Sequence, residues 1–438
     1  MTVLKEFITM AKQTTNTAAI IKMKTVVIVG TMDTKGEQIL FVKQLIEKLG
    51  HKAIIMDTST RGSSPINVDI TCDEIARAAG TSIEEIRRMK EIQKIRSLMI
   101  EGATKKAKEL HHVGKLDGIL SLGGAGAAAI GTAIMKALPF GIPKLMVSSA
   151  AGMEAYAAKW LGTGDIMMMN TLVDLAGLNE MVKNVLTRAV GSICGMVEVT
   201  QFSSLSDLLS SKGNPLIAMT EDGSCEKCGS YVREALEQRG YEVITFHAQG
   251  LGDRAMEELI SKGFFDGVVD IAVTGVSDEL WEGNRPGGPD RLEMAGRRGI
   301  PTVLSPNGLT VTGAGPTRKN SQKYASRSRI YKLDELRAAT RYNGDELMIN
   351  ARTVATKLNK AKGPVKFFIP LRGFSGWEAP GSILYDPHED MIFVNELKRC
   401  LKPEVEVIEI DANLEDEQFA QALVDGFDEL FKNKGGKL

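Results

Sequence analysis

The sequence predicts an α/β protein with two Rossmann-like domains, each an open, mostly parallel sheet flanked by helices. Short apolar, β-branched segments alternate with amphipathic segments along most of the 438 residues, which is the pattern of βαβ units. The alternation stops once, near the middle of the chain, and then starts again. The chain also has 44 glycines but only 5% aromatic residues, as expected for many tight turns and close backbone approaches.

The composition excludes several classes of protein. With 54 basic and 55 acidic residues, the net charge is −1, which argues against a globally basic nucleic-acid-binding protein and gives no reason to expect a membrane-surface protein. No apolar run approaches the ~18 residues of a membrane-spanning helix. The five cysteines are few, odd in number and scattered, as in proteins of the reducing cytosol. We therefore expect a cytoplasmic protein with no membrane partner.

The first domain is expected over residues 24–202, after a loose leader at 1–23 that lacks periodicity. Uncharged apolar runs predict buried strands at 25–29, 53–56, 118–122, 144–147 and 166–169. Amphipathic periodicity predicts helices at 36–49, 82–110, 125–138 and 178–198.

A polar segment at 203–214, followed by Pro215, predicts the boundary of a second domain over 215–438. Strands are expected at 216–219, 242–246, 268–273, 302–304, 365–369 and 405–410. Helices are expected at 231–239, 253–261, 290–298, 345–360, 390–400 and 414–431. Because ligands of parallel sheets bind beyond the carboxyl ends of the strands, the turns after the strands are the candidate sites.

The turn after the first strand has the ingredients of a phosphate-binding loop. It contains Gly30-Thr31-Met32-Asp33-Thr34-Lys35-Gly36, which supplies a glycine, two hydroxyls, a lysine and a helix N-terminus behind them. It is not a Walker A sequence, because the spacer and the Gly-Lys-Ser/Thr order are missing. The carboxylate of Asp33 would ligate Mg²⁺; alternatively, Asp33 or Thr34 only caps the helix.

Other turns face the same edge. The third strand ends in Gly123-Gly124-Ala125-Gly126, whose small residues allow either close approach of a pyrophosphate or tight packing of helix on strand. Asp57 stands where Rossmann proteins read a ribose hydroxyl. Further candidates for nucleobase, ribose or metal contacts are small residues after later strands, which are equally compatible with caps and turns: Ser149, Gly152, Asp165, Asn170 and Asp174.

These motifs together resemble those of a known family. The resemblance lies in the turn at 30–37, the loop at 123–132, and the segments 165–170 and 173–179, and it continues in Phe246-His247-Ala248-Gln249-Gly250 and at 287–293, 305–308 and 369–373. The family spans bacterial proteins and the ATP-binding region of the tomato mosaic virus resistance protein. The resemblance covers nearly the whole chain after Met23. It implies two Rossmann-like subdomains, ATP with Mg²⁺ in the first, and a homodimer.

Position by position, the resemblance implies nucleotide contacts at Asp33, Thr34 and Lys35 and in the loop from Gly123 to Gly126. The chain departs from the family pattern at 125, 127 and 128, where alanines replace hydroxyl residues that would donate to phosphate, and in the turn at 223–227.

The second half offers candidates of its own. His247 ends a strand and Arg254 opens the next helix; together they would bind a carboxylate or phosphate, with His247 as acid or base, or His247 would be satisfied locally. Cys225 and Cys228 at a helix start would form a redox pair, although we favour a packing role. Six basic residues between 318 and 332 would hold an anionic small molecule or nucleic acid, or form a solvated loop.

The sequence thus predicts an ATP–Mg²⁺-binding protein with an anionic small-molecule site in the second domain or an interdomain cleft. As an enzyme it would be an ATP-dependent phosphotransferase or ligase, in which Lys35 neutralises phosphate charge, Asp33 holds Mg²⁺, and His247 with Arg254 faces the acceptor. One alternative is a regulatory module that senses ATP without turnover. The other is a hydrolase or lyase that uses no nucleotide.

Overall fold

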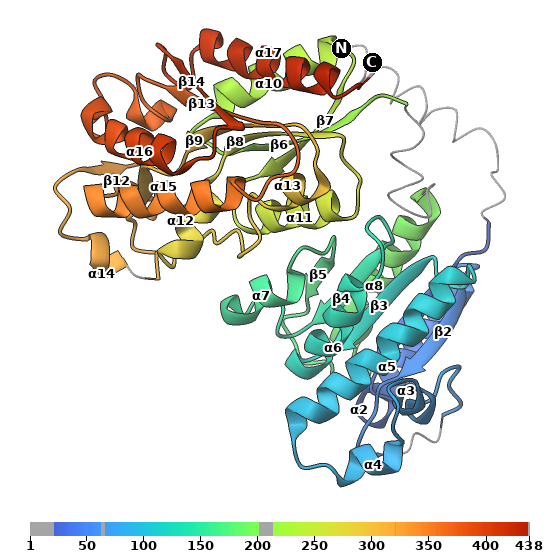
Figure 1. Ribbon diagram of the computed structural model, residues 1–438. Helices are drawn as coiled ribbons and strands as arrows, with labels where there is room; N and C mark the ends of the chain where they lie inside the picture. The colour runs from blue at the N-terminus through green and yellow to red at the C-terminus, as the bar shows by residue number, and fades with distance from the viewer. Residues whose placement is uncertain (1–21, 63–65, 201–212, 320, 437–438) are drawn as a thin grey trace, which may run out of the picture. The chain divides into compact units, whose positions relative to one another are not determined.

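The computed structural model describes residues 22–62, 66–200, 213–319 and 321–436. It divides into two compact units, Met1–Ser211 and Lys212–Leu438, and each has its own parallel sheet (Figure 1). The expected α/β class with two helix-flanked sheets is confirmed. Most of the expected leader and of the expected boundary segment lies outside the described residues. No helix of the described residues is long and apolar enough to span a membrane.

The sheet of the first unit has five parallel strands in the order β2-β1-β3-β4-β5. Its strands are β1 (Thr25–Gly30), β2 (Lys52–Asp57), β3 (Gly118–Gly123), β4 (Lys144–Ser148) and β5 (Met167–Asn170). The chain leaves β1 toward β2 on one side and returns to β3 on the other side. In sheets of this kind, ligands usually bind beyond the carboxyl ends of the strands at such a reversal, which here lies between β1 and β3.

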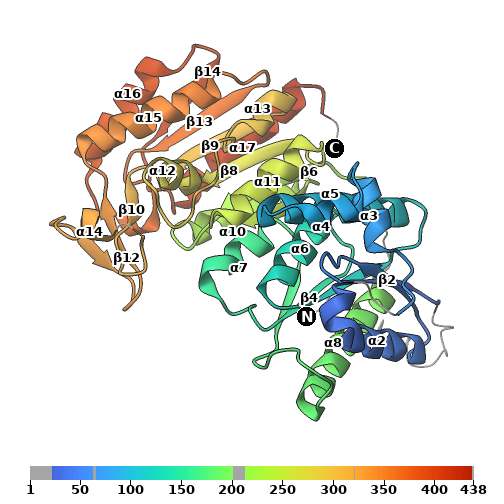
Figure 2. The same ribbon diagram turned by 90° about the horizontal axis from the view of Figure 1, so that it is seen from below.

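Helices cover both faces of this sheet, because successive side chains of a strand point to opposite faces. Val26 and Ile28 of β1 pack with α2 and α8, whereas Val27 and Val29 pack with α3, α5 and α6 (Figure 2). The helices of the first unit are α2 (Met32–Lys48), α3 (Cys72–Ala78), α4 (Ile83–Arg88), α5 (Ile92–His112), α6 (Ala125–Lys136), α7 (Glu154–Leu161) and α8 (Glu180–Val199).

The single helix expected at 82–110 is wrong, because the chain forms α4 and α5 with a break between them. The apolar residues there recur every third position. In an α-helix, residues three apart drift by about 60° around the axis, so one straight helix would not turn all of them toward the core. The break solves this: Ile83 and Ile86 are buried in α4, while Ile92, the first residue of α5, is 61% exposed.

The sheet of the second unit has six parallel strands in the order β14-β13-β9-β8-β6-β7. They are β6 (Leu216–Glu221), β7 (Glu242–His247), β8 (Gly267–Ala272), β9 (Thr302–Asn307), β13 (Val365–Pro370) and β14 (Val405–Ile410). Each overlaps a strand expected from the sequence. The strand order reverses between β6 and β8.

Helices flank this second sheet as well. Ile217 and Met219 pack with α10 and α17 on one face, and Leu304 and Phe367 pack with α15 and α16 on the other. The helices are α10 (Glu226–Gln238), α11 (Leu251–Ser261), α12 (Thr274–Leu280), α13 (Met294–Arg298), α14 (Ser321–Tyr324), α15 (Gly344–Leu358), the 3₁₀ turn η1 (Gly376–Glu378), α16 (Pro387–Cys400) and α17 (Glu417–Asn433).

A small antiparallel sheet in the second unit was not expected from the sequence. It has the order β10-β12-β11, formed by β10 (Val311–Gly313), β11 (Ile330–Lys332) and β12 (Ala338–Arg341). Its strands have only three or four residues each, too few for an apolar period to be recognised. Helix α13 likewise begins four residues later than the helix expected at 290–298.

Candidate functional site

The N-terminus of α6 lies at the strand reversal of the first unit and carries main-chain amides without partners. No hydrogen bond from the amides of residues 125–127 to any other described residue is found, and the N-cap, Gly124, has no side chain to accept one. A Cβ atom added to Gly124 or Gly126 would have nothing within 4 Å. Free amides at the positive end of a helix dipole, open to solvent, form an anion-binding site.

At the N-terminus of α2, on the other side of the reversal, the first two main-chain amides already donate hydrogen bonds to side chains of this protein. The buried carboxylate of Asp57 accepts from the amide of Met32 at 3.1 Å, and Ser59 Oγ accepts from the amide of Asp33 at 3.1 Å. Asp57 also accepts from the amide of Ser59 at 2.9 Å. This corrects two expectations: Asp57 caps a helix instead of facing a ribose, and the first two amides of α2 are not free for phosphate.

The residues of the expected first loop form a short helical turn from Met32, which Lys35, with a non-helical backbone (φ −128°, ψ 18°), separates by a kink from the rest of α2, so the long part of the helix starts at residue 36 as expected. Lys35 Nζ donates to the carbonyl oxygen of Leu175 at 2.6 Å and keeps two further N–H groups. The hydroxyls of Thr31 and Thr34 are exposed and lie 2.6 Å apart. These side chains therefore sit beside the strand reversal, although they do not form a loop around it.

Asp33 is the only member of this turn that could contact a cation through a carboxylate. Its Oδ2 accepts from the amide of Gly62 at 3.1 Å, while its Oδ1 makes no hydrogen bond within the described residues. Among those residues no group of three or more His, Cys, Asp or Glu side chains could hold a metal ion. One free carboxylate oxygen suits Mg²⁺ that arrives with a nucleotide, because Mg²⁺ keeps waters and takes phosphate oxygens.

Most candidates from the later strands lie at the same edge of the first sheet. Ser149 and Gly152 follow β4, and a Cβ added to Gly152 would lie 3.5 Å from Asn170 Nδ2 at the end of β5. Asp174 lies 3.9 Å from Lys35 Nζ, and its side chain is 70% exposed. The candidate residues that follow β1, β4 and β5 therefore lie at the same edge of the sheet, beyond the carboxyl ends of its strands.

Asp165 is a correction, because it lies at the opposite edge of the sheet. It precedes β5, and its carboxylate pairs with the buried Lys144 at 2.5 Å, at the first residue of β4. It also accepts from the amide of Gly141 at 2.7 Å. Asp165 therefore neutralises a buried lysine and is not a cofactor contact at the carboxyl edge.

In the second unit, His247 and Arg254 have separate surroundings. His247 Nδ1 lies 3.3 Å from the carbonyl oxygen of Glu221. Arg254 Nε donates to the carbonyl oxygen of Pro286 at 3.1 Å, and its side chain lines a cavity of about 430 Å³. His247 is not among the residues that line this cavity. The structure therefore does not support His247 and Arg254 as a joint catalytic pair.

Family models match both units. The model described as "Uncharacterised protein family (UPF0261) N-terminal domain" matches residues 24–202, and the corresponding C-terminal domain model matches residues 214–431. The chain belongs to the UPF0261 family. A model described as "GB virus C genotype envelope" also matches, over residues 134–287, which is less than half of the chain.

Relatives of this UPF0261 protein occur in bacteria and in tomato. It is 36% identical over 401 residues to a UPF0261 protein of Clostridium tetani, covering 91% of this chain and 97% of the relative. It is 30% identical over 421 residues to the tomato (Solanum lycopersicum) ToMV resistance protein Tm-1(GCR237), covering 92% of this chain and 55% of the relative. The expected family resemblance is confirmed at the level of the family, and neither name states a ligand.

Among solved structures, this UPF0261 protein is similar to the UDP-GlcNAc 2-epimerase of Methanocaldococcus jannaschii. The TM-score is 0.22 at 11% identity, and the match covers 64% of this chain and 83% of that one. The corresponding enzyme of Rickettsia bellii matches at a TM-score of 0.22 and 12% identity, over 64% of this chain and 78% of that one. Neither similarity bears on function.

Sequence reasoning missed a buried ionic network beside the cavity of this UPF0261 protein. Arg291 is fully buried and contacts three carboxylates: Asp270 at 2.5 Å, Asp253 at 2.8 Å and Glu257 at 3.3 Å. Burial raises the pKa of Glu257 despite the neighbouring guanidinium. Because the four residues come from α11, β8 and the segment before α13, only the tertiary fold brings them together. The signal available in the sequence was the segment at 287–293, which begins with two glycines and contains Arg291.

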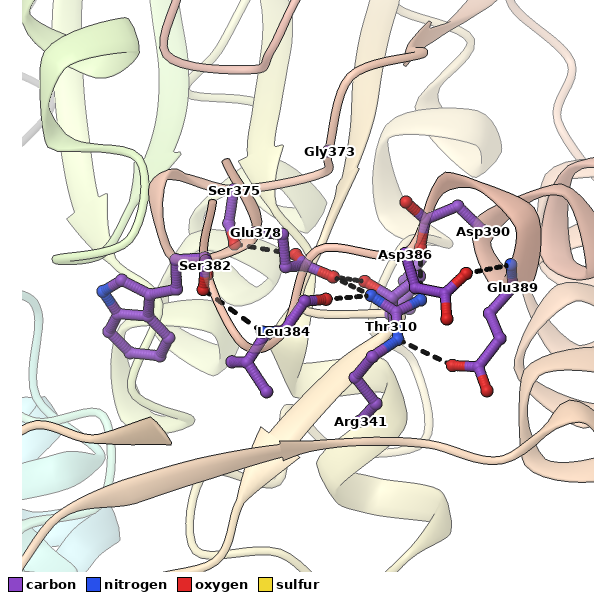
Figure 3. A network of polar contacts seen from close by, with 12 residues as sticks. Thr310, Arg341, Gly373, Ser375, Glu378, Ser382, Leu384, Asp386, Glu389 and Asp390 are labelled. Carbon is purple, nitrogen blue, oxygen red and sulfur yellow. Dashed lines mark hydrogen bonds and ion pairs between the residues drawn. The ribbon is translucent and has the colours of Figure 1, made fainter. Parts of the chain in front are cut away.

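A second buried network surrounds Arg341 at the end of β12 (Figure 3). Arg341 contacts Glu378 at 3.1 Å, Glu389 at 2.9 Å and the Oδ1 atom of Asp390. Thr310 donates to Glu378 at 2.5 Å, while Asp390 Oδ2 has no hydrogen-bond partner. Burial, together with the nearby Glu378, raises the pKa of Asp390 to about 7.

The basic run at 318–332 is largely consumed by ion pairs inside the second unit. Arg327 contacts Glu346 at 2.9 Å, and Arg329 contacts Asp386 at 2.9 Å and Glu389 at 2.6 Å. Lys323 lies over the ring of Trp281, 4.3 Å from its centroid. These pairs join the small sheet and α14 to α15 and α16. Arg327 and Arg329 of this run therefore have a structural role.

Cys225 and Cys228 are both buried, at 0% and 1% exposure. Burial raises the pKa of each thiol well above its usual value. Because the thiolate is the reactive form, burial of these two cysteines of the UPF0261 chain disfavours redox chemistry. They pack in the core beneath α10, which agrees with the packing role and not with a redox pair.

Proposed function

We propose that this protein binds ATP–Mg²⁺ at the strand reversal between β1 and β3, with the phosphates on the N-terminus of α6. The observation that carries the proposal is the set of free amides at residues 125–127, which lie where the strand order reverses. Main-chain donors and a helix dipole there attract phosphate oxygens. The family resemblance that implies ATP supports the same choice of ligand.

In this proposal the side chains around the strand reversal assist the main chain. Lys35 contributes a positive charge to the phosphates, and the free Oδ1 of Asp33 contacts Mg²⁺ directly or through water. When bound, Mg²⁺ neutralises phosphate charge. The exposed hydroxyls of Thr31 and Thr34 provide further donors. The missing hydroxyls at 125, 127 and 128 matter less in this arrangement, because amides and not side chains hold the phosphates.

Catalysis, if it follows binding, would be ATP-dependent phosphoryl transfer or ligation to an anionic acceptor. The alternatives are a module that senses ATP without turnover and a nucleotide-independent hydrolase or lyase. Incubation with ATP–Mg²⁺ and a panel of acids separates them: release of ADP, AMP or pyrophosphate indicates an enzyme, and binding without product indicates a sensor. The homodimer implied by the resemblance stays a prediction, which light scattering in solution tests.

Ala125→Asp is expected to lower ATP affinity at least about tenfold, since the new carboxylate lies over the free amides and repels phosphate. The fold should be kept or slightly stabilised, because an acidic residue in the first turn of a helix contributes about 0.3–1 kcal/mol. Calorimetric titration with ATP–Mg²⁺ measures the affinity. Ala125→Asn is the uncharged control of similar size and should lose much less. Equal affinity in wild type and Ala125→Asp would remove the α6 terminus from the site.

Lys35→Ala is expected to weaken ATP binding about three- to tenfold with the fold intact, since one cation near the phosphates is lost. The same titration checks it. Lys43→Ala is the matched control, because Lys43 lies on the same helix and pairs with Asp69 at 3.4 Å. A Lys35 variant that binds like the Lys43 variant would show that Lys35 only anchors the segment at Leu175.

A further inference from the structure

The cavity beside α11 has the size of a small-molecule site. Its volume is about 430 Å³, within the usual range of ligand pockets. One wall is a single face of α11 with Arg254, Glu257, Glu258 and Ser261, and the others are Glu279 at the end of α12, the segment 287–290 and Met294. All of these residues belong to the second unit.

Close backbone packing holds the walls in place. The amide of Gly287 donates to the carbonyl oxygen of Gly275 at 2.9 Å, and a Cβ added to Gly275 would lie 3.0 Å from the Cα of Gly287. Behind this contact, the buried Arg291 ties α11 to β8 through Asp253 and Asp270. A cavity framed in this way loses little freedom when a ligand binds.

Two charged side chains of the cavity form no ion pair within the described residues. Most acids of the lining are paired outside it: Glu257 with Arg291, Glu258 with Lys262 at 2.6 Å, and Asp290 with Arg297 at 3.0 Å. Arg254 and Glu279, in contrast, have no ion pair there, although both line the same cavity.

The unpaired groups are nevertheless held in position. Arg254 Nε donates to the carbonyl oxygen of Pro286 at 3.1 Å, and Glu279 Oε2 accepts from the amide of Gly288 at 3.0 Å. Both side chains are thus anchored to the segment 286–288 by one atom each. The terminal nitrogens of Arg254 and the second oxygen of Glu279 remain available to a ligand.

We propose that this cavity binds a small molecule of the amino-acid class, with its carboxylate on Arg254 and its ammonium group on Glu279. A simple anion would leave Glu279 unpaired, and a simple cation would leave Arg254 unpaired. A zwitterion satisfies both, and a guanidinium binds a carboxylate through two parallel hydrogen bonds. This binding proposal stands without the proposed ATP site. It rests on the proposed function only in so far as the bound amino acid would be the acceptor of a later reaction.

The test is thermal shift followed by calorimetry with the full-length protein, without nucleotide, so that its failure is separate from failure of the ATP site. The probes are the standard L-amino acids, each at about 10 mM. Propionate, which carries only the carboxylate, and ethylamine, which carries only the ammonium group, are tested beside them. At least one amino acid is expected to raise the melting temperature, while propionate and ethylamine are not. Arg254→Ala and Glu279→Gln should each weaken its binding at least about tenfold.

Arg337→Ala is the matched control, since Arg337 is 71% exposed and pairs only with Asp334 in a turn; it should bind like wild type. Both test residues are exposed, so the variants should fold, which circular dichroism checks. The proposal is overturned if no amino acid shifts the melting temperature, if propionate or ethylamine alone reproduces the shift, or if binding survives in both variants.

Discussion

Replacing Arg291 with methionine is expected to destabilise the second unit by about 3–5 kcal/mol, the usual cost of leaving buried charges without their partner. Methionine keeps most of the side-chain volume but removes the guanidinium that Asp253, Glu257 and Asp270 share. Three carboxylates would then lie buried together. Urea unfolding followed by tryptophan fluorescence measures the loss, since two of the three tryptophans, Trp281 and Trp377, lie in this unit.

Two controls make the Arg291→Met result specific. Arg337→Met removes an exposed arginine and should cost less than about 1 kcal/mol. The loss in Arg291→Met should also shrink as the pH falls toward 5, because carboxyls deprived of the guanidinium take up protons and become neutral. An Arg291→Met protein as stable as wild type at neutral pH would mean that the three carboxyls are already protonated in the native protein.

Asp390→Asn is expected to stabilise the protein at alkaline pH by an amount on the order of 2 kcal/mol or more, and to have a smaller effect near pH 5. In the native protein the pKa of Asp390 is raised to about 7, above its value of about 4 in an unfolded chain. The native state therefore holds the proton more tightly, so stability is lost as the pH rises from about 4 and the loss is complete above about 7. Asparagine keeps the oxygen that Arg341 contacts and removes the charge.

The charge balance around Asp390 explains the sign. Two cations, Arg329 and Arg341, face four carboxyls: Glu378 from η1, the N-cap Asp386, and Glu389 and Asp390 from α16. Figure 3 shows Arg341 among these carboxyls. Melting temperatures of wild type and variant from about pH 5 to about pH 8.5 measure the difference. A difference that stays constant with pH would show that Asp390 is ionised throughout. Asp425→Asn, on the exposed side of α17, is the control at an exposed carboxyl.

Much of the fold followed from local patterns. The strands of both parallel sheets were expected because uncharged β-branched runs are buried on both faces. The free amides of α6 could also be predicted from the sequence, since glycines and alanines after a strand leave a helix without a side-chain cap. The helix break near residue 89 and the small sheet β10-β12-β11 were not, because short elements are decided by how they pack.

The candidate site shows where local reasoning ends. Asp57 was recognised as a polar residue at the correct edge, but its role depends on the α2 amides, which are 25 residues away. Asp165 was assigned to the ligand edge as a turn residue, yet it precedes β5 and therefore lies at the opposite edge. Arg254 was predicted from the sequence as a ligand-binding residue. The other charged side chain of its cavity without an ion pair in the described residues is Glu279, and His247 does not line this cavity.

The sequence by itself determined the α/β class, the two sheets and the family, because each rests on periodicity or on contiguous motifs. Only the tertiary structure decided which helix N-terminus is free, since a carboxylate from β2 fills α2 and none fills α6. It alone also decided which charges are paired. An ion pair depends on side chains brought within about 4 Å, and residues such as Asp253, Asp270 and Arg291 come that close only when the chain has folded.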